Sequence, residues 1–338
     1  MKTFLRLAVL AVVGTTALAL AGNALATQKL SVRQTPTSLT VKISQAQTDP
    51  QPAKITVYVP SGYTINAAAA AGAKIGTATG TVFVRDQNIP LPLSGDVVVA
   101  PPNTNATGCA TGTHLAVWVL DLQVAGQSQQ LPVHVDPTAG AETALGAYKL
   151  VICLPPADVP QGTPGRAPNG SQLLDATFEV DNVFTAAPGD TVWKAFTTPW
   201  KPGVPVPNPA GTVETRALVS NGTVTLNAKA LKIKGKRYVR ATGKVTQAGA
   251  AVAGTQVSLL LNGKLRFRTK PTSAAGAYSI VLQKKGKKTT TTFQTRVTVA
   301  ERDATTIGCA SPSLPNVPCV NATSSGFTGV SRKIRIRL

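Results

Sequence analysis

Short runs of alternating apolar and polar residues, each ended by Gly, Pro, Asn or Asp, recur along the chain. In LLDATFEVDNVF at 173–184, Leu174, Ala176, Phe178 and Val180 fall on one side of an extended strand and acidic residues on the other. Seven similar runs precede it, at 38–43, 53–59, 81–84, 96–100, 114–124, 131–135 and 147–154. No long amphipathic helical window is present, so the sequence predicts an all-β protein with helix below about a tenth of its residues.

The N-terminus has the three parts of a secretory signal peptide. Lys2 and Arg6 precede the apolar run LAVLAVVGTTALALAG, and the small residues NALA follow at 23–26. This pattern predicts cleavage after Ala26, with an uncleaved membrane anchor as the alternative. No later stretch approaches the ~18 apolar residues of a spanning helix. We therefore expect a secreted, periplasmic or cell-surface protein without a transmembrane segment, and the Ala- and Gly-rich composition is typical of bacteria.

A proline-rich stretch, TTPWKPGVPVPNPAG at 197–211, divides the chain into two parts. Clustered prolines favour an extended spacer and exclude a central strand. The sequence thus predicts two β-sandwich domains, at 27–197 and 213–338, joined by a linker at 198–212 that no sheet should cross. We recognise no named family in the first of these domains.

The charge is divided unequally between the two parts. Residues 27–205 carry ten Lys and Arg against eleven Asp and Glu, whereas residues 206–338 carry 22 against three. The net charge of +20 therefore belongs almost entirely to the second domain.

The segment GKVTQAGAAVAGTQVSLLLNGKLRFRTKPTSAAGAYSIVL at 243–282 resembles the carboxypeptidase-regulatory-like and related bacterial Ig-like modules. The residues that carry their pattern are Gly243, Val245, Val252, Gly254, Val257, Leu259, Thr272, Gly276 and Tyr278. The acidic or Asn residue usual before the turn glycine is replaced here by Ser273-Ala274-Ala275. The resemblance implies a seven-stranded sandwich. It also implies a non-catalytic appendage or wall component, since such a fold does not specify an activity.

Four cysteines in an exported chain predict disulfides, and four cysteines allow three pairings. The simplest solution keeps each bridge within one domain, as Cys109–Cys153 and Cys309–Cys319. A zinc site is the alternative, but the chain has no CxxC spacing. We therefore expect neither a metal nor a cofactor.

Cations recur at alternate positions of the second domain's strands. In KALKIKGKRYVR at 229–240 we expect Leu231 and Ile233 in the core, and in the next hairpin Leu265 and Phe267. The simplest interpretation is that these cations lie on the solvent-exposed face of a β-sandwich. The large excess of positive over negative charge in this domain also favours weak binding of an anionic envelope or extracellular polymer. The residues predicted to bind it are Lys232, Lys234, Arg240, Lys264, Arg266, Arg268, Lys284, Lys285, Lys287 and Lys288.

Specific nucleic-acid binding is not predicted, because Tyr238 is the only aromatic residue expected among the exposed cations. Catalysis is not predicted either. His134 and Asp136 share one strand face, which indicates a surface ion pair, and His114 lies at a strand start. The sequence thus predicts an exported, non-catalytic structural or binding protein. The alternative is a ligand-binding or enzymatic first domain tethered by the second, which a deep, polar-lined pocket would favour.

Overall fold

The computed structural model describes residues 27–104, 109–124, 126–185, 189–284, 289–304 and 317–337. The proposed signal peptide and Cys309 lie outside these ranges. Of the described residues, 59% are in strands and 4% are helical, which confirms the all-β prediction. Within the described ranges, no helix is long and apolar enough to cross a membrane.

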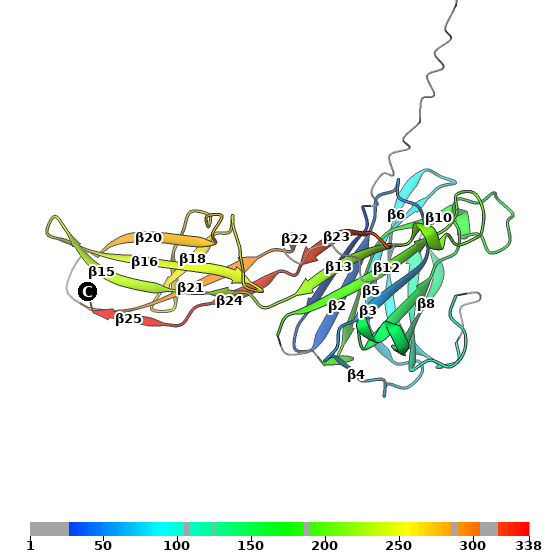
Figure 1. The fold of residues 1–338 in the computed structure, drawn as a ribbon, viewed down its shortest axis with the longest axis horizontal. Coiled ribbons are helices and arrows are strands. Elements are labelled where there is room, and N and C mark those ends of the chain that lie inside the picture. The colour runs from blue at the N-terminus through cyan, green and yellow to red at the C-terminus, as the bar shows by residue number, and fades with distance from the viewer. Residues whose placement is uncertain are drawn as a thin grey trace, which may run out of the picture.

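The structure has two bodies, a broad one and a narrow one (Figure 1). We name the broad one the first lobe; it comprises 27–219 with 302–303 and 319–324. The narrow one is the basic lobe, which comprises 223–299 with 327–337.

One thirteen-stranded sheet forms the first lobe, in the order β1-β2-β10-β5-β6-β7-β8-β9-β3-β12-β13-β23-β22. Neighbouring strands are antiparallel except β13 and β23, which are parallel. The strands are β1 Lys29–Gln34, β2 Ser38–Ser44, β3 Pro52–Val59, β5 Lys74–Val84, β6 Ile89–Ala100, β7 Ala116–Val124, β8 Gln127–Pro137, β9 Tyr148–Cys153, β10 Ser171–Asp181, β12 Thr191–Pro199, β13 Val213–Val219, β22 Arg302–Asp303 and β23 Cys319–Ser324. The remaining elements of this lobe are the paired strands β4 Thr64–Ile65 and β11 Phe184–Thr185 and the 3₁₀ helices η1 Gly140–Ala144, η2 Pro168–Gly170 and η3 Pro209–Gly211.

The long sheet folds over until its first strand meets its last ones. Lys29 Nζ lies 2.7 Å from Asp303 Oδ1, and Thr323 Oγ1 donates to the carbonyl of Leu30 at 2.6 Å. The folded sheet encloses a large apolar core, in which Trp193 is fully buried. The first lobe is therefore sandwich-like although its strands form one sheet.

The expectation that no sheet would cross the proline-rich stretch was wrong. β12 and β13 pair antiparallel in the same sheet, and the stretch is the connection between them. Proline cannot donate a backbone hydrogen bond, so the prolines are confined to this loop and the strand end. The flanking segments 191–198 and 213–219 contain no proline and are free to pair. The stretch at 198–212 thus does not separate two sheets.

The basic lobe consists of two five-stranded sheets. The first contains β14 Thr223–Val224, β15 Asn227–Ile233, β16 Lys236–Gln247, β17 Ala250–Ala251 and β20 Ala277–Lys284. The second contains β18 Val257–Leu261, β19 Lys264–Arg268, β21 Thr290–Val299, β24 Phe327–Val330 and β25 Ile334–Arg337. Two small apolar clusters lie between the sheets, one around Val245 and Tyr278 and the other around Leu259 and Phe293.

In the described part of the chain, three segments connect the lobes. The crossings are 220–222, 300–301 and 325–326. Gln247, at the end of β16 and 3% exposed, joins them through its side-chain amide. Its Nε2 donates to the carbonyls of Ser220 and Ser325, both at 3.0 Å, and its Oε1 accepts from Arg302 at 2.6 Å. The lobes are thus connected by backbone and by a buried hydrogen-bond network.

Candidate anion-binding surface and a polar cavity

The basic lobe contains no acidic residue. Residues 220–300 and 325–338 carry twenty Lys and Arg and no Asp or Glu. The three acids of the second half, Glu214, Glu301 and Asp303, lie in β13, the second crossing and β22. The structure therefore separates the charges more completely than the sequence division did, and leaves a field of one sign on this lobe.

The β15–β16 hairpin turns at Lys234 and Gly235, whose φ angles of 47° and 73° are both positive. This two-residue turn sets the register of the hairpin and places Lys232 opposite Arg237. Arg237 and Val239 are two residues apart in β16 and so face the same side of the sheet, and Val239 is buried. Lys232, opposite Arg237, therefore lies on the core side of the sheet. The prediction that Lys232 belongs to the outer face was thus wrong, and Lys234 lies in the turn and not on a strand face. Both are nevertheless exposed, because they lie at the hairpin tip.

The outer face of this sheet mixes apolar side chains with cations. Leu231 lies opposite Tyr238, and Arg240 opposite Val281. Ile233 and Val281 are each 45% exposed. The prediction that Leu231 and Ile233 are core residues was wrong for the same reason of register, whereas Arg240 is exposed as predicted.

Strand β19 is an edge strand that is exposed at every residue. A β-bulge shifts its pairing, so that Phe267 lies opposite Leu259 and Leu265 opposite Leu260. Leu265 and Phe267 are 51% and 42% exposed, and the prediction that they are core residues was wrong. The bulge breaks the two-residue alternation, and no second neighbour covers the strand. Exposed along this edge are the predicted cations Lys264, Arg266 and Arg268.

Sequence reasoning missed Arg296. It lies in β21 opposite Ser258 of β18, whose other cross-strand neighbour is Arg268. The alternation of Arg296 with the buried Thr295 and Val297 was a usable signal. The remaining predicted residues, Lys285, Lys287 and Lys288 and the side chain of Lys284, lie outside the described part of the chain.

The first lobe has a polar cavity of about 310 Å³. Its lining residues are Lys54, Thr56, Tyr58, Cys109, Ala110, Thr111, His114, Asp136, Glu142, Lys149 and Val151. Glu142 accepts from Tyr58 Oη at 2.8 Å and from Lys149 Nζ at 2.7 Å. Burial acts to raise the pKa of Glu142, but these two hydrogen bonds outweigh it and lower the pKa. Burial, with the contact to Glu142, raises the pKa of Tyr58.

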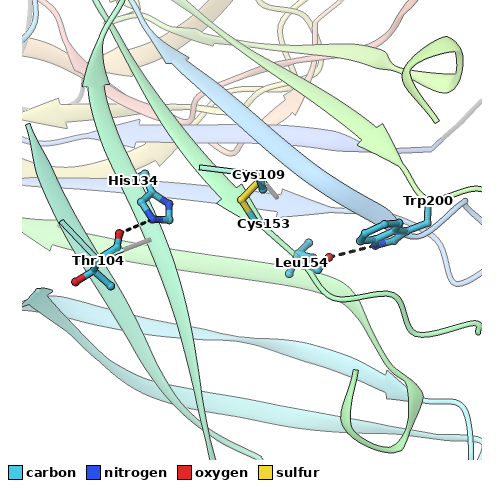
Figure 2. The surroundings of a disulfide bond; sticks show 6 residues. All are labelled: Thr104, Cys109, His134, Cys153, Leu154 and Trp200. Carbon is cyan, nitrogen blue, oxygen red and sulfur yellow. Dashed lines mark hydrogen bonds between the residues drawn. A yellow bond between two sulfur atoms is a disulfide. The ribbon is translucent and has the colours of Figure 1, made fainter. Parts of the chain in front are cut away.

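Two histidines lie beside this cavity. His114 Nδ1 is 2.9 Å from Asp136 Oδ2, while His134, fully buried, bonds through Nε2 to the carbonyl of Thr104 at 3.0 Å (Figure 2). The predicted surface ion pair of His134 with Asp136 was thus wrong, because the partner of Asp136 comes from another element. Burial lowers the pKa of His134, and so does neighbouring His114. Among the described residues, no group of three or more His, Cys, Asp or Glu could hold a metal.

The Cys109–Cys153 disulfide is present as predicted, with its Cα atoms 6.0 Å apart (Figure 2). Cys109 lines both the polar cavity and an apolar groove of about 780 Å³. Prolines and Trp200 dominate this groove, and Trp200 Nε1 donates to the carbonyl of Leu154 at 3.1 Å (Figure 2). Because Cys309 lies outside the described residues, the Cys309–Cys319 bridge stays a prediction.

No protein-family model matches the chain, and no curated protein matches it. The pattern at 243–282 has a clear place in the structure, because Val245, Val252, Val257 and Tyr278 pack in one cluster. The resemblance of this segment to Ig-like modules stays a prediction.

Proposed function

We propose that this chain is an exported, non-catalytic binding protein whose basic lobe associates with an anionic polymer of the cell envelope or the extracellular medium. The resemblance of residues 243–282 to Ig-like modules is consistent with such a role. The observation that carries the proposal is the set of twenty cations at 220–300 and 325–338 without a single acid.

A lobe whose charged side chains are all positive attracts polyanions, because each contact releases a counterion from the polymer. Such a lobe also repels itself, which lowers stability, so selection for stability alone does not account for it. In the described part of the basic lobe, Arg240, Lys264, Arg266 and Arg268 form no ion pair and remain available to a ligand.

The test is retention of the full chain on heparin and on teichoic acid across a salt gradient. Residues 213–338 alone are unsuitable, since β13 would lose its partner strand β12, and β22 and β23 would lose their contacts to β1. A variant with Arg240, Lys264 and Arg266 changed to Gln should elute at lower salt. The slope of log affinity against log salt should fall by roughly one unit per lost contact.

The matched control changes three exposed cations of the first lobe, Lys42, Lys54 and Lys201, to Gln. It removes the same net charge and should keep most of the retention of the original chain. Equal loss in both variants would show that net charge alone is responsible, and the proposal would fail.

A second candidate function is small-molecule binding by the first lobe, which the polar cavity of about 310 Å³ favours. Cations and carboxylates line the same space, so zwitterionic amino acids and neutral sugars are suitable probes. A thermal-shift screen with these two classes should give stabilisation that Glu142→Gln removes. If no probe shifts the unfolding temperature, this candidate is rejected.

A further inference from the structure

A shallow cavity of about 370 Å³ opens on the outer face of the second sheet of the basic lobe. It is lined by Gly254, Thr255, Gln256, Ser258, Arg268, Arg296 and Thr298. All the side chains among these are hydroxyls, an amide or guanidinium groups, and none is a carboxylate. The cavity is therefore rich in hydrogen-bond donors.

The strand register brings the two arginines together. Ser258 of β18 pairs with Arg268 of β19 on one side and with Arg296 of β21 on the other. Its neighbours Val257 and Leu259 are buried, so Ser258 faces outward, and directly opposite residues share its face. Neighbouring strands are about 4.8 Å apart. Two guanidinium groups thus flank one hydroxyl on three adjacent strands.

This arrangement is electrostatically unfavourable without an anion. Arg268 and Arg296 lie on the two sides of one strand and line the same cavity, so their like charges repel each other. In the described part of the chain neither arginine forms an ion pair, and the sequence of the lobe offers no acid to supply one. A bound oxyanion would relieve this repulsion. The planar fork of each arginine matches the paired oxygens of a phosphate or a sulfate.

We propose that Arg268, Ser258 and Arg296 form a subsite for one tetrahedral oxyanion, a phosphate or sulfate group, carried by the polymer that the basic lobe binds. The polymer part of this inference rests on the proposed function. The hydroxyls of Thr255 and Thr298 line the same cavity and supply further donors. The planar geometry of the two arginines, in addition to their charge, then favours a phosphate or sulfate group over other anionic groups.

The test uses the full chain with Arg268 and Arg296 both changed to Lys, which keeps the charge and removes the forks. The control changes Arg335 and Arg337, two exposed arginines outside the cavity, to Lys. The probes are polyphosphate, heparin and the carboxylate polymer polyglutamate. The cavity variant should bind polyphosphate or heparin about tenfold more weakly, as expected for lost bidentate contacts, and polyglutamate equally well. The control should change none of the three affinities.

An equal loss for polyglutamate, or no loss for polyphosphate and heparin, overturns the subsite. The two polymers also distinguish phosphate from sulfate as the source of the group. Titration of the original chain with inorganic phosphate and inorganic sulfate, followed by NMR at the arginine Nε–H groups, is independent of the polymer. Shifts at Arg268 and Arg296 without polymer binding would support the subsite and reject the proposed function, and no shift with polymer binding would do the reverse.

Discussion

At the scale of single residues, the basic lobe depends on a close approach at Gly243. This residue lies opposite Tyr278 in the β16–β20 pair. A Cβ atom at Gly243 would lie 2.0 Å from the carbonyl oxygen of Thr225 and 2.6 Å from Tyr278 Oη. The tyrosine ring therefore occupies space that a larger residue at 243 would need, and its hydroxyl donates to Thr225. This packing gives a physical reason for glycine and tyrosine to occur together in the segment.

Gly243→Ala should destabilise the basic lobe by about 1–3 kcal/mol, the usual cost of overpacking. All three tryptophans, Trp118, Trp193 and Trp200, lie in the first lobe. The midpoint of urea unfolding followed by far-UV circular dichroism should thus fall more than the midpoint followed by tryptophan fluorescence. Ser279→Ala, on the exposed face of β20, is the control and should move neither midpoint. Equal shifts of both midpoints would contradict a local effect.

His134 makes the stability of the first lobe depend on pH. Burial lowers its pKa below the ordinary 6.5, so the unfolded chain binds a proton that the folded chain does not. Stability should then be complete above pH ~6.5 and decrease as the pH falls below it. His134→Gln should flatten this dependence between pH ~5.5 and ~7.5. Thermal unfolding followed by tryptophan fluorescence at several pH values measures this dependence. If the unfolding temperature of the variant changes with pH as much as that of the original chain, His134 is not the group responsible.

At the scale of elements, β19 is open to pairing with another chain, because its exposed edge carries Leu265 and Phe267. An open edge with apolar side chains can pair with another chain, and cations on it prevent this by repulsion. Arg266 lies at the bulge of this strand. The cations of β19 thus have a protective role besides any ligand binding.

Arg266→Val should increase aggregation, measured by light scattering during incubation at moderate temperature. Arg240→Val is the matched control, since it makes the same change on β16, which pairs with β15 and β20 on its two sides. We expect the control to aggregate no faster than the original chain. Equal aggregation of the two variants would indicate that lost charge matters and the open edge does not.

The elements also show what the sequence could predict. The two-residue period predicted strand β10 correctly, and it also predicted the alternation of buried Val239 and Ala241 with exposed Arg240 in β16. Both strands have a neighbour on each side and one face toward solvent. The two-residue period failed for Leu231 and Leu265. At these positions a turn and a bulge set the phase, and both are tertiary choices that periodicity does not contain.

The candidate sites were predicted less well than the strands. The disulfide could be predicted because a cysteine has only a few possible partners. The cavity around Glu142 could not, since Tyr58, His114 and Lys149 come from distant segments that only the strand order brings together. The pairing of Arg268 with Arg296 across Ser258 has the same origin.

At the scale of the whole molecule, the three crossings and the buried Gln247 fix the junction of the lobes. Gln247→Leu would leave the carbonyls of Ser220 and Ser325 without these donors, at a cost of about 1–3 kcal/mol per buried unpaired group. Hydrogen exchange should become faster in peptides that contain the crossings. Gln283→Leu, on the exposed face of β20, is the control. Unchanged exchange at the crossings would contradict a role for Gln247 in the junction.

The parallel pairing of β13 with β23 also determines the order in which the molecule can assemble. These strands are neighbours in the sheet, yet β14 to β21, the greater part of the basic lobe, lie between them in the sequence. The segment that contains β14 to β21 is thus an insertion between two neighbouring strands of the first lobe, whereas β24 and β25 follow β23. A nascent chain that ends before residue 319 still has an open edge at β13, so the first lobe cannot be completed until the chain has been made as far as β23.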